Sequence, residues 1–174
     1  MNFVHVIVQG HPVAKGRARS GLIPKKGGGY VADKTGRPVI AHYTPPDTRK
    51  WEDRARGDGR VAMNNLSPEN GPLRLSVIAY FAPSESWPEW KKQAALDGAV
   101  CHTAKPDADN LVKAAKDAMN GIVWLDDSQV VEFSAAKRYS TKPRVEITVE
   151  RMIAASSRIT KRSDLGKTSS LINP

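Results

Sequence analysis

Two aspartates separated by a single residue, Asp107 and Asp109, are the side chains whose spacing best suits chemistry. In an extended segment such a pair points to one face, with the Cα atoms about 7 Å apart. Two negative charges about 6 Å apart repel by roughly 3 kcal/mol at an effective dielectric near 20, and a bound cation removes that cost. Carboxylate oxygens are the preferred ligands of hard divalent ions. The pair therefore predicts a Mg²⁺ site.

An amphipathic helix is predicted directly after this pair. Apolar residues recur at helical spacing over residues 111–119, with Asp109 or Asn110 as the N-cap and Asn120-Gly121 as the end. Lys113 follows Asp109 by four residues, so it shares the face of Asp109 and places a positive charge near the carboxylates. An anionic substrate would meet both charges.

A third carboxylate is expected from the segment after the helix. The apolar run 122–125 predicts a short buried strand that ends at Asp126-Asp127. If the helix packs antiparallel to this strand, Asp127 returns to the neighbourhood of Asp107 and Asp109. Taken alone, an aspartate before a helix is usually a cap and a pair after a strand is usually a turn. The combination in one basic chain favours a metal site.

A long ordered motif includes all of these residues. It consists of KPDADNL at 105–111, Lys113, Asp117, NG at 120–121 and DDSQV at 126–130, with weaker parts in PVAKGR at 12–17, Lys137 and PRVE at 143–146. The motif resembles the signature of the RusA family of Holliday junction resolvases, and the resemblance extends over most of the chain up to about Arg151.

The resemblance implies a homodimeric endonuclease, dependent on Mg²⁺ with Mn²⁺ as a substitute, that cuts four-way DNA junctions symmetrically in recombination and repair. It implies Asp107, Asp109 and Asp127 as the catalytic and metal-binding acids and Lys113 as an essential neighbour. Asp126 is the adjacent alternative to Asp127. It also implies a cytoplasmic protein encoded by a bacterium or a prophage.

Composition narrows the class of protein. A chain of 174 residues with a net charge of +9 predicts one domain and a polyanionic partner, with nucleic acid as the first candidate and an anionic membrane as the second. No membrane-spanning run and no secretion signal are visible, so we expect a soluble intracellular protein without a membrane partner. The single Cys101 and four scattered histidines disfavour a disulfide or a zinc site. No phosphate-binding GxxxxGK[ST] motif is present, which argues against a nucleotide cofactor.

Basic residues that could bind DNA fall in several places. Residues 14–37 are rich in glycine and in cations, which predicts a flexible loop that binds backbone phosphates or, alternatively, a solvated linker. The DNA-binding candidates are Lys15, Arg17, Arg19, Lys105, Lys116, Lys137 and Arg138.

The remaining pattern predicts an α+β (mixed α/β) fold. Strands are expected at 3–9, 73–81, 129–139 and 145–149, and the last two should form an antiparallel hairpin. A small hairpin is expected within 30–41, turning at Thr35-Gly36. Helices should begin near Pro45-Pro46 and at a capping box on Ser86.

These elements predict one largely antiparallel sheet of about four or five strands, covered by two or three helices. We expect a nuclease domain at 1–151 and a basic, flexible tail at 152–174.

Two other functions share most of these residues. One is a non-catalytic nucleic-acid-binding protein, in which the acidic cluster is a capped turn and the basic loop does the binding. The other is a metal-dependent nuclease with flap or single-strand specificity. Strand scission that disappears in chelator separates the first from a nuclease, and a comparison of DNA substrates separates the second.

Overall fold

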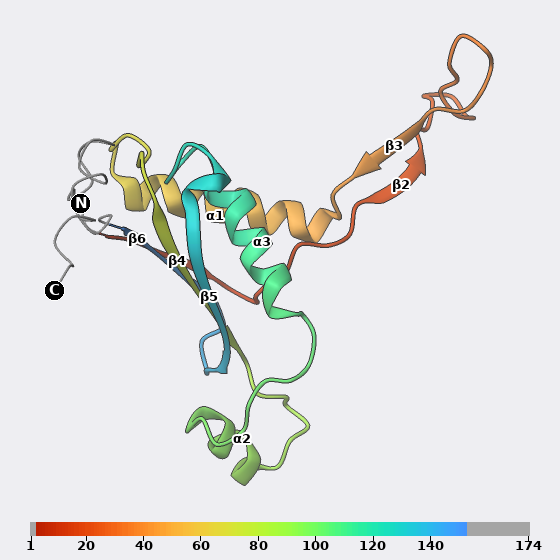
Figure 1. The fold of residues 1–174 in the computed structure, drawn as a ribbon. Coiled ribbons are helices and arrows are strands. Elements are labelled where there is room, and N and C mark those ends of the chain that lie inside the picture. Colours follow the sequence, from red (N-terminus) through yellow and green to blue (C-terminus); the bar gives the residue numbers. More distant parts are fainter. Residues whose placement is uncertain (1–2, 153–174) are drawn as a thin grey trace, which may run out of the picture.

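Four strands form one mixed sheet in the computed structural model, which describes residues 3–152. The strand order is β1 (Phe3–Gln9), β6 (Arg144–Arg151), β4 (Leu73–Phe81) and β5 (Val130–Tyr139) (Figure 1). β1, β6 and β4 are antiparallel neighbours, whereas β4 and β5 run parallel. The predicted α+β class, with a four-stranded sheet and three helices, is confirmed.

The predicted hairpin between residues 129–139 and 145–149 is wrong. β5 and β6 lie on opposite sides of β4, and the link 140–143 passes the end of β4, where Ser140 N donates to Phe81 O at 2.9 Å. Two strand spacings are about 10 Å, which four residues span easily. β4 takes the place between them because its inner face is fully buried from Leu73 to Phe81, so it gains most from hydrogen-bonded partners on both edges.

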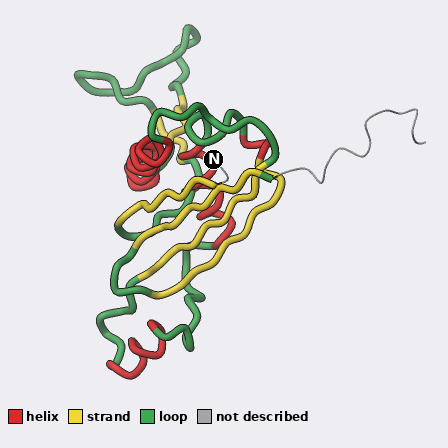
Figure 2. The backbone as a smooth tube through the Cα atoms, turned by 90° about the vertical axis from the view of Figure 1, so that its left-hand side faces the viewer, coloured by secondary structure: helices red, strands yellow, loops and turns green. Residues whose placement is uncertain are grey.

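Two helices cover one face of the sheet. α1 (Pro46–Met63) packs on β1, and α3 (Ala108–Met119) packs on β4 and β5 and also on α1 (Figure 1). The predicted apolar stripe of α3 is confirmed, because Leu111, Val112, Ala115, Ala118 and Met119 are all buried. The opposite face of the sheet is mostly polar, with Phe3 and Ile7 of β1 as exposed apolar residues on it, and its strands lie in the foreground of Figure 2. There Arg74 forms ion pairs with Glu132 and Glu150.

The helix predicted to open at Ser86 and to run through Leu96 is present, but the predicted capping box is not. α2 (Glu89–Leu96) begins after Pro88 and has no side-chain cap, because the Ser86 hydroxyl is hydrogen-bonded to Ser84 Oγ at 2.9 Å instead. α2 lies beyond the ends of the strands and does not cover the sheet (Figure 1).

The predicted strand at 122–125 is also wrong. This segment is a tight turn in which Val123 and Trp124 are buried, closed by a hydrogen bond from Gly121 N to Trp124 O at 2.8 Å. The apolar side chains enter the core from the turn, so their burial needs no strand. A short 3₁₀ helix, η1 (Asp127–Gln129), then leads into β5.

A second, two-stranded sheet projects from the body of the molecule. β2 (Arg19–Leu22) pairs antiparallel with β3 (Ile40–Tyr43) (Figures 1 and 2). The predicted turn at Thr35-Gly36 is present, since Gly36 N donates to Asp33 O at 3.1 Å. The prediction of a flexible loop over 14–37 overlooked β2, which carries little apolar signal but pairs residue by residue with β3.

Two further expectations concern the ends of the fold and the membrane. Apart from Met152, the predicted tail at 152–174 lies outside the described residues. No helix in residues 3–152 is long and apolar enough to cross a membrane.

The two glycines of α1 should respond differently to the same substitution. A Cβ at Gly59 would lie 3.1 Å from Met119 Sδ, whereas one at Gly57 would meet nothing within 4 Å. We expect Gly57→Leu to raise the free energy of unfolding by up to about 1 kcal/mol through helix propensity. Gly59→Leu should lower it by about 1–3 kcal/mol, because α1 and α3 would be forced apart. Denaturant titration measures both, and equal effects would contradict the close approach of the helices at Gly59.

Candidate functional site

Asp107 lies at the beginning of α3. The helix starts at Ala108 with Asp107 as its N-cap, so the predicted cap at Asp109 or Asn110 is two or three residues too late. An N-cap aspartate usually accepts a hydrogen bond from the first turn of its helix. The exposed Asp107 carboxylate makes no such bond. Its oxygens therefore remain available to a ligand.

Asp109 pairs with the lysine that the spacing predicted. Lys113 Nζ donates to Asp109 Oδ2 at 3.0 Å, and both side chains are exposed. The hydrogen bond from Lys113 lowers the pKa of the Asp109 carboxyl below its ordinary value. Asp109 is therefore ionised at neutral pH, as a ligand of a cation must be.

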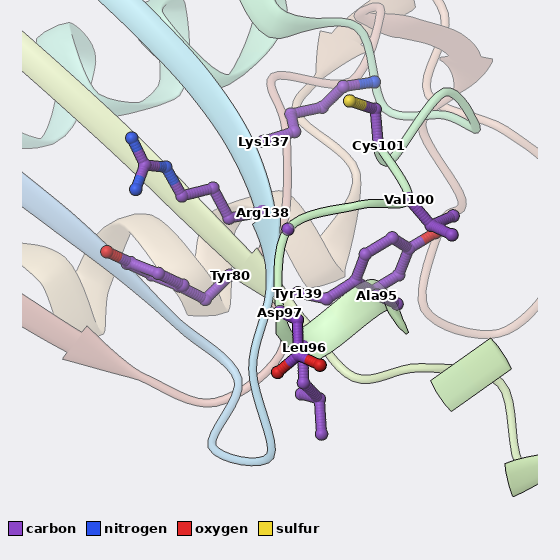
Figure 3. A pocket seen from close by; sticks show the side chains of 10 residues that line it. Tyr80, Ala95, Leu96, Asp97, Val100, Cys101, Lys137, Arg138 and Tyr139 are labelled. Atoms are coloured by element: carbon purple, nitrogen blue, oxygen red, sulfur yellow. The ribbon is translucent and has the colours of Figure 1, made fainter. Parts of the chain in front are cut away.

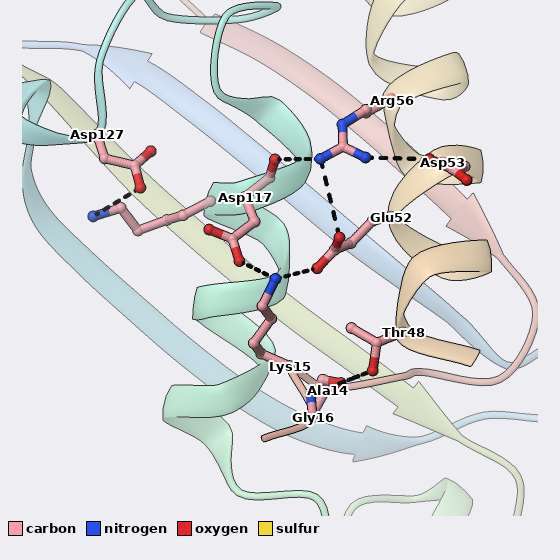
Figure 4. A network of polar contacts seen from close by, with 10 residues as sticks. Ala14, Lys15, Gly16, Thr48, Glu52, Asp53, Arg56, Asp117 and Asp127 are labelled. Atoms are coloured by element: carbon pink, nitrogen blue, oxygen red, sulfur yellow. Dashed lines mark hydrogen bonds and ion pairs between the residues drawn. The ribbon is translucent and has the colours of Figure 1, made fainter. Parts of the chain in front are cut away.

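The two consecutive aspartates after the turn have different roles. Asp126 Oδ1 accepts a hydrogen bond from Ser128 N at 2.9 Å, which closes a capping box with Gln129 at the start of η1. Asp127 instead accepts from Trp124 Nε1 at 3.0 Å, and its other oxygen lies 4.0 Å from Lys116 Nζ (Figure 4). Asp126 is thus used by its own turn, whereas Asp127 faces α3.

Two acids and two lysines form a row of charges along one side of α3. Asp109, Lys113 and Lys116 are spaced i, i+4 and i+7, and Asp127 extends the row beyond Lys116. Within residues 3–152, no three acidic, histidine or cysteine side chains lie close enough together to hold a metal ion. The donor chemistry still suits Mg²⁺, which commonly takes one or two carboxylates and completes its shell with water and substrate phosphate.

Basic residues gather next to Asp107. A hollow of about 490 Å³ is lined by Lys15, Arg17, Lys105, Asp107 and Asn110, together with Ala14, Gly16 and Pro106. The structure therefore brings three of the predicted DNA-binding residues beside one of the predicted catalytic acids. Arg19 lies further along, at the start of β2.

Lys15 is held by two carboxylates at the edge of this hollow. Its Nζ lies 2.8 Å from Glu52 Oε1 on α1 and 2.6 Å from Asp117 Oδ2 on α3 (Figure 4). Burial lowers the pKa of Lys15, but the hydrogen bonds and charges of Asp117 and Glu52 outweigh it, and the net pKa is raised. Arg56 also donates to Asp117 O at 3.1 Å. The ammonium group fastens the N-terminal segment to both helices.

Sequence reasoning missed Glu52. Its side chain is only 7% exposed, although it is a charged residue next to the buried Trp51 of the α1 stripe. A glutamate at the margin of an apolar stripe was a signal for an internal ion pair, but nothing in the sequence indicated its partner.

Lys137 and Arg138 point to opposite sides of β5, on the rim of a pocket of about 450 Å³ (Figure 3). Lys137 Nζ donates to Ala104 O at 2.8 Å and to Pro106 O at 3.1 Å. These carbonyls lie three residues and one residue before Asp107, so Lys137 positions the segment that carries that carboxylate. Arg138 belongs to the polar face of the sheet, away from α3.

The exposed acids and lysines of α3 lie next to a hollow lined with cations, an arrangement that suits contact with backbone phosphates. The family model described as endodeoxyribonuclease RusA matches residues 9–150. The chain belongs to this family, whose name implies nuclease activity.

Two relatives are similar to this chain. One is an uncharacterised protein of Bacillus subtilis, YqaN, which is 31% identical over 159 residues, covering 88% of this chain and all of the relative. The other is the crossover junction endodeoxyribonuclease rusA of Lactococcus phage r1t, which is 36% identical over 84 residues, covering 47% of this chain and 56% of the relative.

Removing the lysine between α1 and α3 should destabilise the fold. We expect Lys15→Gln to lower the free energy of unfolding by about 2 kcal/mol, because the buried Glu52 loses its closest cation. Lys113→Gln is the matched control, since it breaks an exposed pair with Asp109 and should change stability by less than about 1 kcal/mol. Urea denaturation compares the two.

The same contact gives a test in alkaline solution. Because the folded pKa of Lys15 is raised above 10.5, its contribution is fully present below that pH and is lost as the pH rises through the folded pKa. The stability difference between the wild type and Lys15→Gln should therefore shrink above about pH 10.5. A difference that stays constant would show that the ion pairs do not stabilise the fold.

Proposed function

We propose that this protein is a Mg²⁺-dependent endodeoxyribonuclease that resolves four-way DNA junctions by paired, symmetric incisions. The observation that carries the proposal is the row of carboxylates and lysines on α3, which begins beside the basic hollow at Asp107. Family membership and the name of the phage relative support a junction substrate. The proposed role is in recombination and repair.

Asp107 and Asp109 would hold the metal ion, with water and substrate phosphate completing its shell. Asp127, the third predicted acid, lies beside Lys116 in the last turn of α3, and the three carboxylates form no single cluster within residues 3–152. Asp107 has an uncapped carboxylate, Asp109 is kept ionised by Lys113, and Asp127 faces α3 while Asp126 caps its own turn. When bound there, Mg²⁺ (or Mn²⁺) supplies a Lewis acid for the scissile phosphate and lowers the pKa of water.

The lysines of α3 neutralise negative charge in the same place. Lys113 and Lys116 offset Asp109 and Asp127 in the chain without DNA. When a phosphodiester lies against this face, the same ammonium groups stabilise the charge that develops on it, and they are already positioned by the helix. Arg17 and Lys105 in the hollow bind neighbouring phosphates, which orients the strand.

Paired incisions require two sites acting on one junction. We therefore propose a homodimer in which each protomer cuts one strand. Such a dimer has two-fold symmetry that matches the pseudo-symmetry of a four-way junction.

Asp109→Asn tests the assignment of the site. We expect cleavage of a synthetic junction in Mg²⁺ to fall by about 10²-fold or more, while junction binding is kept or improves because a negative charge facing DNA is removed. Asp53→Asn is the matched control: Asp53 is also a helical aspartate of similar exposure paired within its helix, to Arg56 at 3.2 Å, and its loss should leave cleavage unchanged.

Three results would count against the proposal. Cleavage by Asp109→Asn at the wild-type rate would contradict the site, and loss of cooperative melting would indicate a structural role. Wild-type protein that binds junctions without Mg²⁺-dependent scission would support the non-catalytic alternative. Faster cleavage of flaps or single strands than of junctions would support a nuclease of different specificity.

A further inference from the structure

The two-stranded sheet that projects from the body is not covered by any other described element. We define the arm as residues 19–43, which comprise β2, β3 and the segment between them. None of its residues is buried, and it extends away from the main sheet and helices (Figures 1 and 2). An isolated two-stranded ribbon is only marginally stable in water. An exposed ribbon of this length is therefore best explained by contact with a partner.

The arm ends in two turns. Backbone hydrogen bonds link Ile23, Val31 and Val39 to one another near the end of the ribbon. Beyond them, the first turn (25–29) is closed by Lys25 N donating to Gly29 O at 3.0 Å, and the second turn (33–37) by Asp33 N donating to Arg37 O at 2.8 Å. Glycines at positive φ form the bends, with open space around them. The end of the arm is thus an ordered pair of turns.

The positive charge of the arm is concentrated on these turns. It has five basic and one acidic side chain, and four of the cations lie on the two turns, namely Lys25, Lys26, Lys34 and Arg37. Within residues 3–152 none of these four forms an ion pair, whereas Lys15, Arg56, Lys113 and Lys116 on the body all do. The four cations are available to an external polyanion.

The acidic residue of the arm does not neutralise them. The Asp33 carboxylate accepts hydrogen bonds from Thr35 Oγ1 at 2.6 Å, Thr35 N at 2.8 Å and Arg37 N at 3.0 Å. These bonds lower the pKa of Asp33, with the Thr35 hydroxyl as the largest cause. Asp33 therefore shapes the second turn, which presents Lys34 and Arg37.

The arm starts beside the candidate site. Arg17, two residues before β2, lines the hollow that includes Lys105 and Asp107. At the 3.3 Å per residue of extended chain, the six residue steps from Arg19 to Lys25 span about 20 Å, which equals about six base pairs of duplex. A two-stranded β-ribbon fits the major groove of B-DNA, which is about 12 Å wide. The side chains of Tyr30 and Ile40 are 56% and 60% exposed, so both would be free to make apolar contact with such a groove.

We propose that the arm binds the duplex flanking the cut, lying along its major groove with the two turns against phosphates about six base pairs from the branch point. This inference rests on the proposed function, because it places the scissile phosphate at the row of residues on α3. The body then holds the branch and the arm holds one duplex limb. The substrate is consequently a branched DNA whose limbs are longer than about six base pairs.

The proposal is tested by measuring how junction binding depends on the length of the DNA limbs and on the charge of the two turns, which we call the tip of the arm. The tip variant carries Lys25→Gln, Lys26→Gln, Lys34→Gln and Arg37→Gln, and the control variant carries Lys50→Gln, Arg60→Gln, Lys142→Gln and Arg151→Gln, all on the body. Binding is measured with four-way junctions whose limbs are about 25 base pairs long, or about five base pairs long and closed by hairpin loops. A second variant joins Leu22 to Ile40 through Asn-Gly, the sequence suited to a two-residue hairpin.

We expect the wild type and the control variant to bind the long-limbed junction at least about tenfold more tightly than the short-limbed one. The tip variant and the shortened variant should bind the two equally, with a salt dependence of the binding constant reduced by about 3–4 in log–log slope for the tip variant. Hydroxyl-radical protection should extend about six base pairs from the branch for the wild type and less for the tip variant.

Equal binding of long and short limbs by the wild type would overturn the proposal, as would unchanged binding by the tip variant. Equal losses in the tip and control variants would show a general charge effect, which also overturns it. Reduced binding of the tip variant to anionic phosphatidylglycerol vesicles, with DNA binding intact, would assign the arm to lipid instead. All of these experiments measure binding, so they test the role of the arm even if the wild type cuts no junction. The absence of cleavage would contradict the proposed function and not the proposed role of the arm.

Discussion

The ammonium group of Lys15 sets the relative positions of the elements around the candidate site. It lies between Glu52 of α1 and Asp117 of α3, at the point where the chain leaves β1 and moves toward the arm. Lys15 N also donates to Asn110 O at 2.9 Å, in the first turn of α3. One residue thus links two helices and the base of the projecting ribbon. The contribution of Lys15 to the stability of the fold depends on the burial of Glu52, because a buried carboxylate without a neighbouring cation is energetically costly.

Features that depend on neighbouring residues could be predicted from the sequence, for a physical reason. The strand at 73–81 and the stripe on α3 follow from apolar periodicity, which reports directly which side chains enter the core. The contact between Asp109 and Lys113 follows from helix geometry alone. The prediction of a strand at 122–125 was wrong because a short apolar segment can be buried in a turn as well as in a strand, and periodicity does not distinguish a buried turn from a buried strand.

Long-range partners could not be predicted in the same way. Glu52 lies 37 residues from Lys15, and Lys137 lies 31 residues from Pro106. Neither spacing has a signature in the sequence, because the contacts exist only once the helices and strands have packed. The order of strands in the sheet is equally hidden, since alternation in β5 and β6 does not reveal which edge of β4 each one takes. The pairing of Asp109 with Lys113 on α3 could therefore be predicted from the sequence, whereas the long-range contacts made by Glu52 and Lys137 could not.

The place of β6 in the sheet has a consequence for how this protein is made. β6, the last strand within residues 3–152, inserts between β1 and β4, so β1 has no described neighbour in the sheet until residues 144–151 have left the ribosome. Val145, Ile147 and Val149 then complete the buried layer in one late step. Pairings so distant along the chain are formed slowly. During synthesis the nascent N-terminal half therefore exposes an apolar strand with unpaired edges, and surface of this kind promotes aggregation until β6 covers it.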